Sequence, residues 1–280
     1  MSQPVKLHVF AAHWGHAGKP AQQFIDEVKA AGFDGIEMSL PADEAEWAHW
    51  LERIRDAGLL LITQQWETVF HSDFAQHKTA LENLLRRACA AQPLMVNSHT
   101  GKDWYSVAQN QELIALTTAI SQQTGVRIVH EIHRSRFSGH PALMAPYLAH
   151  NPDLPLNADL SHWCCACESL LQDQQAMLEG IFPLVKHIHA RVGHAQGPQV
   201  SDFRAPEFAA ELQAHLSWWD QILQARVAAG ETCLTITPEF GPVPYTATLP
   251  YSQQEVSNAW ELNVAMMHLL RARYATHGWC

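Results

Sequence analysis

The sequence repeats one pattern eight times: a short apolar run, in most units followed by a longer segment of helical period. The apolar runs cover 7–12, 35–38, 59–64, 94–97, 126–130, 154–158, 185–190 and 233–237. Helical spacing occurs at 21–31, 44–57, 78–91, 111–124, 169–182, 207–229 and 253–274. Alternating strands and helices indicate a parallel sheet, because parallel neighbours need a crossover between them. An open doubly wound sheet is compatible with this order, but eight units in 280 residues favour a closed (β/α)8 barrel.

Glycines mark where several of these helices should end. Gly32, Gly58, Gly125 and Gly230 each precede an apolar run, at the place where a residue in the left-handed conformation stops a helix. No Gly-x-Gly-x-x-Gly motif follows the first run, and no glycine-rich phosphate loop with Lys-Ser or Lys-Thr occurs. We find no linker or low-complexity tract, so the fold class we expect is α/β, a single TIM-barrel domain over residues 1–280.

Composition narrows the class of protein further. The chain is 47% hydrophobic and 16% charged, with a formal net charge of −10. An acidic chain lacks the basic face that nucleic-acid binding needs, so we expect no nucleic-acid partner. No run is long and apolar enough to cross a membrane, and the first residues lack the layout of a signal peptide. We therefore expect a cytoplasmic protein with no membrane partner; a homo-oligomer stays open.

Polar residues stand where the predicted strands end, which is where barrel enzymes carry their chemistry. They are His13, Glu37, Trp66, His99, Glu131, Asp159, His189 and Glu239. The intervals between them are nearly regular until the last, which is longer because residues 193–206, rich in Gly, Pro and Gln, are inserted after the seventh strand. Inserted barrel loops of this length are often functional lids.

Four consecutive strand ends predict a metal site. Glu131, Asp159, His189 and Glu239 end strands five to eight. Three carboxylates at one barrel mouth would repel one another unless a cation joined them. Three carboxylates and one imidazole make a mostly hard ligand set, which suits Mn²⁺, Mg²⁺ or Co²⁺ and tolerates Zn²⁺.

In these motifs the chain resembles the xylose-isomerase-like barrels, which include sugar and sugar-phosphate isomerases, ketose epimerases and endonuclease IV. The motifs are a Glu ending strand five, Asp-x-x-His after strand six, His-x-His on strand seven and a Glu ending strand eight. The resemblance implies that Glu131, Asp159, His189 and Glu239 bind metal. It also implies that His162, the His of Asp-x-x-His, contacts substrate.

One position departs from the epimerase pattern. The epimerases carry a substrate-binding Arg six residues after the metal His, where this chain has Ala195. The nearest arginine, Arg191, shares a strand face with His187 and His189 and should point into the barrel. It is either a substrate anchor or one half of a buried ion pair.

Other residues are weaker candidates. His99, Trp66 and His13 follow strand ends and are candidates for substrate binding; packing or a satisfied histidine explains each equally well. His187 lies one step deeper than His189, and we interpret it as a hydrogen-bonded core residue. The group His133, Arg134 and Arg136 either holds an anionic substituent or is a solvated loop.

The resemblance and the residues together predict a metal-dependent isomerase or epimerase of a sugar or keto-sugar. Glu131 and Glu239 would remove and return a proton through a metal-stabilised enediolate. The same chemistry allows a lyase or dehydratase that eliminates from a keto-sugar, keto-inositol or 3-keto-glycoside. An endonuclease IV-like phosphodiesterase conflicts with the acidic charge, and a non-catalytic sugar- or metal-binding barrel is the remaining alternative.

Overall fold

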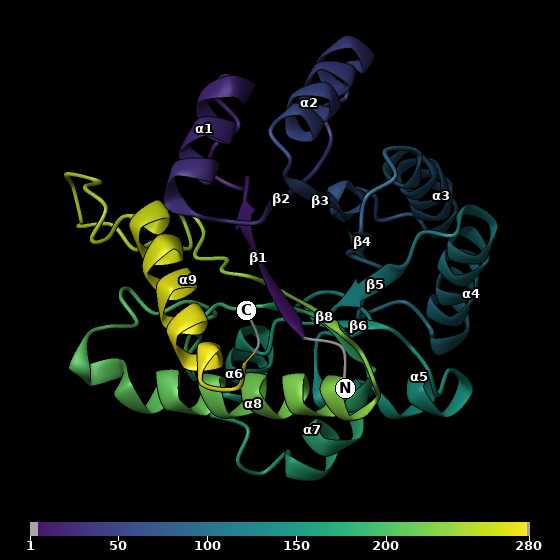
Figure 1. The fold of residues 1–280 in the computed structure, drawn as a ribbon. Helices are drawn as coiled ribbons and strands as arrows, with labels where there is room; N and C mark the ends of the chain where they lie inside the picture. Colours follow the sequence, from purple (N-terminus) through teal and green to yellow (C-terminus); the bar gives the residue numbers. More distant parts are fainter. Residues whose placement is uncertain (1–4, 279–280) are drawn as a thin grey trace.

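A computed structural model describes residues 5–278 and shows eight parallel strands closed into a barrel (Figure 1). The strands are β1 Lys6–Ala12, β2 Gly35–Met38, β3 Leu60–Gln65, β4 Met95–Ser98, β5 Ile128–Glu131, β6 Leu156–Ala158, β7 Val185–His189 and β8 Cys233–Thr237. Each strand pairs with the next, and β1 pairs with β8 to close the cylinder, Leu7 facing Leu234. The predicted TIM barrel is confirmed, and every strand begins within two residues of the predicted position.

Helices surround the strands (Figure 1). They are α1 Ala21–Ala31, α2 Glu44–Asp56, α3 Phe74–Ala90, α4 Val107–Thr124, α5 Ala145–His150, α6 Ser161–Cys167, α7 Gln175–Ile181, α8 Ala209–Ala228 and α9 Ala259–Ala275. The helix predicted over 169–182 is confirmed only in its second half, as α7, and the short helix α6 before it was not predicted. The chain breaks there because Glu168 and Leu171 adopt positive φ angles of 49° and 58°, which end one helix before the next begins. The sequence analysis also missed the short helix α5.

Local sequence explains eight of the eighteen boundaries of α1–α9. Side chains of Asp43, Asp73, Ser106 and Asn258 accept backbone hydrogen bonds at the starts of α2, α3, α4 and α9. The predicted stop glycines all have positive φ, between 70° at Gly58 and 92° at Gly32. These caps satisfy backbone groups that would otherwise be left without a partner at the helix ends.

The core has two layers. Inside the barrel, Phe10, Ile62, Met95 and Val129 pack together. Outside it, apolar faces of the helices cover the strands, as Trp50 and Ile54 of α2 do. Polar side chains therefore stay available at the carboxyl ends of the strands, above the apolar filling. No helix in residues 5–278 combines the length and the apolar character that crossing a membrane requires.

The segment between β7 and α8, which contains the inserted residues 193–206, has no helix apart from the 3-10 turn Pro206–Phe208. A hydrogen bond fixes the start of the insertion to α8, since Gly193 N donates to Nε2 of His215 at 3.2 Å. Farther along, the side-chain amide of Gln199 donates from Nε2 to the carbonyl of Gly241 and accepts at Oε1 from its backbone N–H. The insertion is thus joined to the segment that follows β8.

Candidate metal centre and pocket

The four predicted metal ligands meet at the carboxyl end of the barrel. Glu131 and His189 are the last residues of β5 and β7, Asp159 follows β6 directly, and Glu239 lies two residues past β8. One ligand atom from each lies within 4.8 Å of the others, and all four side chains are buried. Side chains at the ends of four separate strands therefore form one buried group of three carboxylates and one imidazole. We call these four predicted metal ligands the ligand group.

Hydrogen bonds orient the His189 ring toward the carboxylates. Its Nε2 lies 2.9 Å from Oε1 of Glu37, which can only accept, so Nε2 carries the proton of that bond. Its Nδ1 has no hydrogen-bond partner and lies 2.9 Å from Oε2 of Glu239. Burial lowers the pKa of His189, but Glu239, Glu37 and Glu131 outweigh it and hold that pKa well above the usual value. A metal ion at Nδ1 would replace the proton that points at Glu239, so the ring is oriented as a metal-binding imidazole requires. The donor set fits a divalent cation.

Neighbouring side chains fix Glu131 as well. Its Oε2 accepts hydrogen bonds from Nδ2 of Asn97 at 2.6 Å and from Nε2 of His99 at 2.8 Å. Its Oε1 lies 3.7 Å from Nδ1 of His189, on the side of the ligand group. Burial raises the pKa of Glu131, but His99 and His189 outweigh it and hold that pKa well below the usual value. The carboxylate stays ionised.

Arg191 forms the buried ion pair that the sequence analysis gave as one alternative. Its Nη2 contacts Oδ2 of Asp159 and lies 3.4 Å from Oε2 of Glu239. Asp159 also accepts a hydrogen bond from the hydroxyl of Ser161. Burial raises the pKa of Asp159 to about 6, and the pull of Arg191 only partly offsets this. A second cation beside Asp159 would favour its ionised form.

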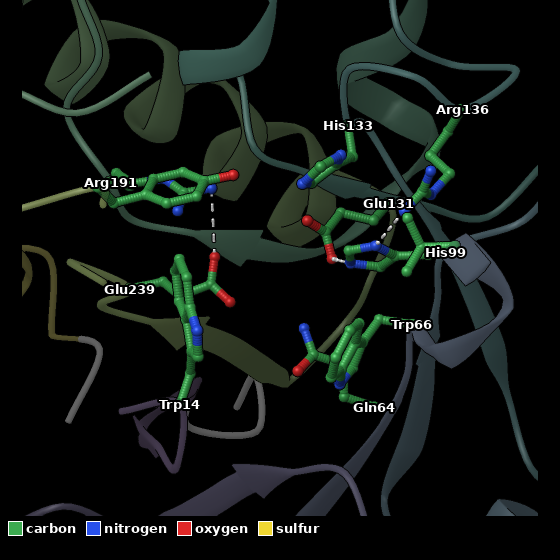
Figure 2. Close-up of a pocket in the computed structure, with 11 residues that line it drawn as sticks. Trp14, Gln64, Trp66, His99, Glu131, His133, Arg136, Arg191 and Glu239 are labelled. Carbon is green, nitrogen blue, oxygen red and sulfur yellow. Dashed lines mark hydrogen bonds and ion pairs between the residues drawn. The ribbon is translucent and has the colours of Figure 1, made fainter. Parts of the chain in front are cut away.

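A pocket of about 250 Å³ opens directly onto this group (Figure 2). Its lining combines aromatic and charged side chains: Trp14, Gln64, Trp66, Val69, His99, Glu131, His133, Arg136, Arg191, Glu239 and Tyr245. Arg191, Glu239 and Trp14 lie across the cavity from His99 and Arg136 (Figure 2). Aromatic walls around a few polar groups are typical of sites for small ring-shaped ligands.

The predicted substrate-binding residues divide into two groups. His99, Trp66 and Arg191 line the pocket. His162 is fully buried behind Arg191, with its Nε2 3.0 Å from Nη2 of that residue, so it supports the arginine. The structure does not bring His13 to the pocket lining: its ring packs against Phe24 and Trp50 at centroid distances of 5.0 and 4.9 Å.

The sequence analysis did not identify Asn97 and Tyr245 as residues of the site. Asn97 lies inside the barrel between Glu37 and Glu131, and its position one residue before the end of β4 was the available signal. Tyr245 stacks on the guanidinium of Arg191, 4.7 Å from its ring centroid, and comes from an irregular segment with no periodicity to reveal it. Glu37, which stood among the strand-end residues, binds both His187 and His189 below the ligand group.

His187 is a core residue, as interpreted from its depth. Its Nε2 lies 3.1 Å from Glu37 and 3.0 Å from the hydroxyl of Thr237, and its Nδ1 lies 2.8 Å from that of Thr235. Burial lowers its pKa, with Glu37 opposing the effect. His133, in contrast, faces the cavity: its Nδ1 donates to the carbonyl of Arg134 at 2.6 Å, which leaves Nε2 as an acceptor (Figure 2).

No protein-family model and no curated protein matches the chain. Solved structures do match it. A 3-keto-D-glucoside 4-epimerase from E. coli is 12% identical, with 95% of this chain and 100% of that chain covered and a TM-score of 0.62. A probable 3-DHS dehydratase from Bacillus anthracis is 15% identical, with 94% and 98% covered and a TM-score of 0.61.

A third matching structure was solved with a bound metal ion. It is a xylose isomerase-like TIM barrel protein from Mycobacterium smegmatis in complex with magnesium, 14% identical, with 96% and 97% covered and a TM-score of 0.59. The chain has a xylose isomerase-like TIM-barrel fold. At these identities the xylose isomerase-like neighbours establish the fold alone, and the chemistry has to be argued from the side chains.

Proposed function

We propose that the protein is a metal-dependent isomerase or epimerase of a sugar or keto-sugar. The observation that carries the proposal is the group Glu131, Asp159, His189 and Glu239, whose donor atoms lie within 4.8 Å of one another beside a ring-sized pocket. The description of a xylose isomerase-like neighbour with magnesium supports a divalent cation, and the E. coli neighbour supports keto-sugar chemistry.

The four residues would hold a divalent cation such as Mn²⁺, Mg²⁺, Co²⁺ or Zn²⁺. When bound, such a cation stabilises negative charge on nearby oxygen atoms. Glu131 and Glu239 would flank the substrate, one removing the proton beside a carbonyl and the other returning it to the neighbouring carbon or to the opposite face. Arg191, held by Asp159 and Tyr245, would orient substrate hydroxyl groups. Trp14 and Trp66 would cover the apolar face of the ring.

A second candidate is elimination of water or of a glycoside leaving group. The observation that favours it is His133, whose free Nε2 faces the pocket within the group His99, Glu131 and His133. Burial lowers the pKa of His133 well below its usual value, so the ring is neutral and Nε2 offers a lone pair to the pocket. An additional proton carrier suits elimination, in which one group takes the carbon-bound proton and another protonates the leaving group. The Bacillus anthracis neighbour supports this alternative.

Turnover in D₂O distinguishes the two. The metal-loaded protein is incubated with ketohexoses, a 3-keto-D-glucoside and 3-DHS, and the products are analysed by mass and NMR spectroscopy. Deuterium at carbon in an isomer supports isomerisation or epimerisation, whereas loss of water or of the aglycone supports elimination. Glu239→Gln should abolish turnover, and Glu255→Gln, an exposed change in the same connection, should not. Full activity of Glu239→Gln would contradict the proposal.

A further inference from the structure

Arg136 places a positive charge at the pocket that no acidic group of the described residues contacts. Its side chain lines the pocket and is only 3% exposed. Nη1 donates to the carbonyl of Ser135 at 3.0 Å, Nη2 lies 3.4 Å from Nδ1 of His99, and Nε has no partner. Within residues 5–278, no carboxylate lies within 4.0 Å of this guanidinium. A buried charge without a counter-charge is unfavourable unless a ligand supplies one.

Lys102 lies on the same side of the pocket and is also a buried cation that no described carboxylate contacts. It is 4% exposed, and its Nζ donates to the carbonyl of Val69, a pocket residue, at 2.9 Å. No carboxylate of the described chain lies within 4.0 Å of it either. Other buried cations differ, since Arg191 contacts Asp159 and Arg226 contacts Glu231 at 2.6 Å. Unpaired buried cations thus gather at the loops after β4 and β5.

The charges of the ligand group do not compensate them. Glu131, Asp159 and Glu239 carry three negative charges, and Arg191 with one divalent cation balances all three. Glu37 lies below the ligand group, where His187 and His189 bind it. Glu131 is separated from Arg136 by the ring of His99, so with the metal in place no described carboxylate contacts this guanidinium. A substrate is the remaining source of a negative charge in contact with it.

We propose that the substrate carries a carboxylate group and that Arg136 binds it, with Lys102 adding positive potential from behind. The proposal rests on the proposed function for the metal end of the substrate. A single planar guanidinium matches one carboxylate, whereas a phosphate dianion normally collects several donors. Arg134 adds none at this place, because its guanidinium lies 5.0 Å from the ring centroid of Tyr245.

The geometry also limits the size of the acid. One imidazole separates the two ends: Nδ1 of His99 faces Arg136 at 3.4 Å, and its Nε2 lies 2.8 Å from Glu131. A carboxylate at Arg136 and reacting oxygen atoms at the ligand group must therefore be only a ring's width apart. The volume of about 250 Å³ agrees with a compact cyclic or short open-chain hydroxy acid.

Two ring probes test the inference without turnover. Catechol and 3,4-dihydroxybenzoate present the same vicinal oxygen atoms and differ only by one carboxylate. Their binding to the metal-loaded protein is measured by titration calorimetry or by quenching of tryptophan fluorescence. We expect 3,4-dihydroxybenzoate to bind at least about tenfold more tightly, since a hydrogen bond to a charged group contributes that much. Inorganic phosphate serves as a competitor.

Variants assign the preference to Arg136. Arg136→Gln should lose most of it and still bind catechol, Arg136→Lys should keep part of it, and Arg55→Gln, an exposed arginine of α2 outside the pocket, should keep all of it. Catechol binding and melting temperature report whether each variant folds. Equal binding of the two probes to the wild type, or an unchanged preference in Arg136→Gln, would overturn the proposal, as would phosphate binding more tightly than 3,4-dihydroxybenzoate. Failure of turnover with every keto-sugar would count against the proposed function and leave these binding ratios unchanged.

Discussion

Arg191 and Asp159 form a fully buried ion pair at the mouth of the barrel. Asp159 directly follows β6, and Arg191 lies two residues after the end of β7. The same guanidinium lies 3.4 Å from Glu239 and is stacked on Tyr245. One arginine thus neutralises part of the charge of the ligand group and also forms a wall of the pocket.

Arg191→Met should therefore destabilise the metal-free protein. The change leaves Asp159 buried without its counter-charge, and breaking a buried pair in this way costs about 3–5 kcal/mol. Urea unfolding in EDTA measures the free energy of unfolding. Arg55→Met, at an exposed position of α2, is the matched control and should change it by less than about 0.5 kcal/mol. A loss below about 1 kcal/mol for Arg191→Met would show that the pair is not needed.

His215 should make the protein sensitive to acid. Burial lowers its pKa to about 4, and the neutral ring donates from Nδ1 to the carbonyl of Glu211 and accepts at Nε2 from Gly193. Because the folded pKa lies below the unfolded value of 6.5, the stabilisation is full above pH 6.5 and is lost as the pH falls toward 4. The loss amounts to about 3 kcal/mol for a shift of this size.

Unfolding of the EDTA-treated protein at pH 7, 6 and 5 checks this. His215→Gln should be less stable than the wild type at pH 7 and lose less stability on acidification, whereas the exposed control His150→Gln should follow the wild type. Burial also lowers the pKa of His130 to about 4, so the protein remains partly sensitive to acid in both variants. Parallel pH curves for His215→Gln and the wild type would contradict the assignment.

Gly35, the first residue of β2, leaves no room for a side chain. A Cβ there would lie 2.5 Å from the carbonyl oxygen of Leu60 and 2.6 Å from the ring of Phe10. Gly35→Ala should lower the free energy of unfolding by about 1–3 kcal/mol, the usual cost of overpacking a core. Gly18→Ala, where a Cβ meets nothing within 4 Å, is the control. Equal free energies of unfolding for the two variants in urea would contradict this, because they would show that the barrel can shift to make room for a methyl group at Gly35.

The barrel and the position of four polar residues at one rim were predictable because both follow from periodicity. Each strand is a short apolar run, and the polar residue at its end must lie at one rim once the cylinder closes. The structure therefore brings the four residues together as expected: Glu131, Asp159, His189 and Glu239. Their role as metal ligands stays a prediction.

The rest depended on side-chain direction and on irregular segments, which periodicity does not encode. His13 and Trp14 follow the same strand, but the structure turns Trp14 to the pocket and packs His13 against Phe24. Tyr245 reaches Arg191 from a connection without regular structure. The break between α6 and α7 occurs at Glu168 and Leu171, which carry no glycine or proline signal.

Metal analysis of the purified chain tests the central claim most directly. The protein is stripped with EDTA and titrated with Mn²⁺ and with Mg²⁺, and bound metal per chain is measured by elemental analysis together with the melting temperature. The account predicts one divalent ion per chain at the ligand group, a higher melting temperature in the loaded protein, and loss of both effects in Asp159→Asn but not in Glu255→Gln. Metal content and melting temperature of Asp159→Asn equal to those of the wild type, or a wild type that binds no divalent ion, would contradict it.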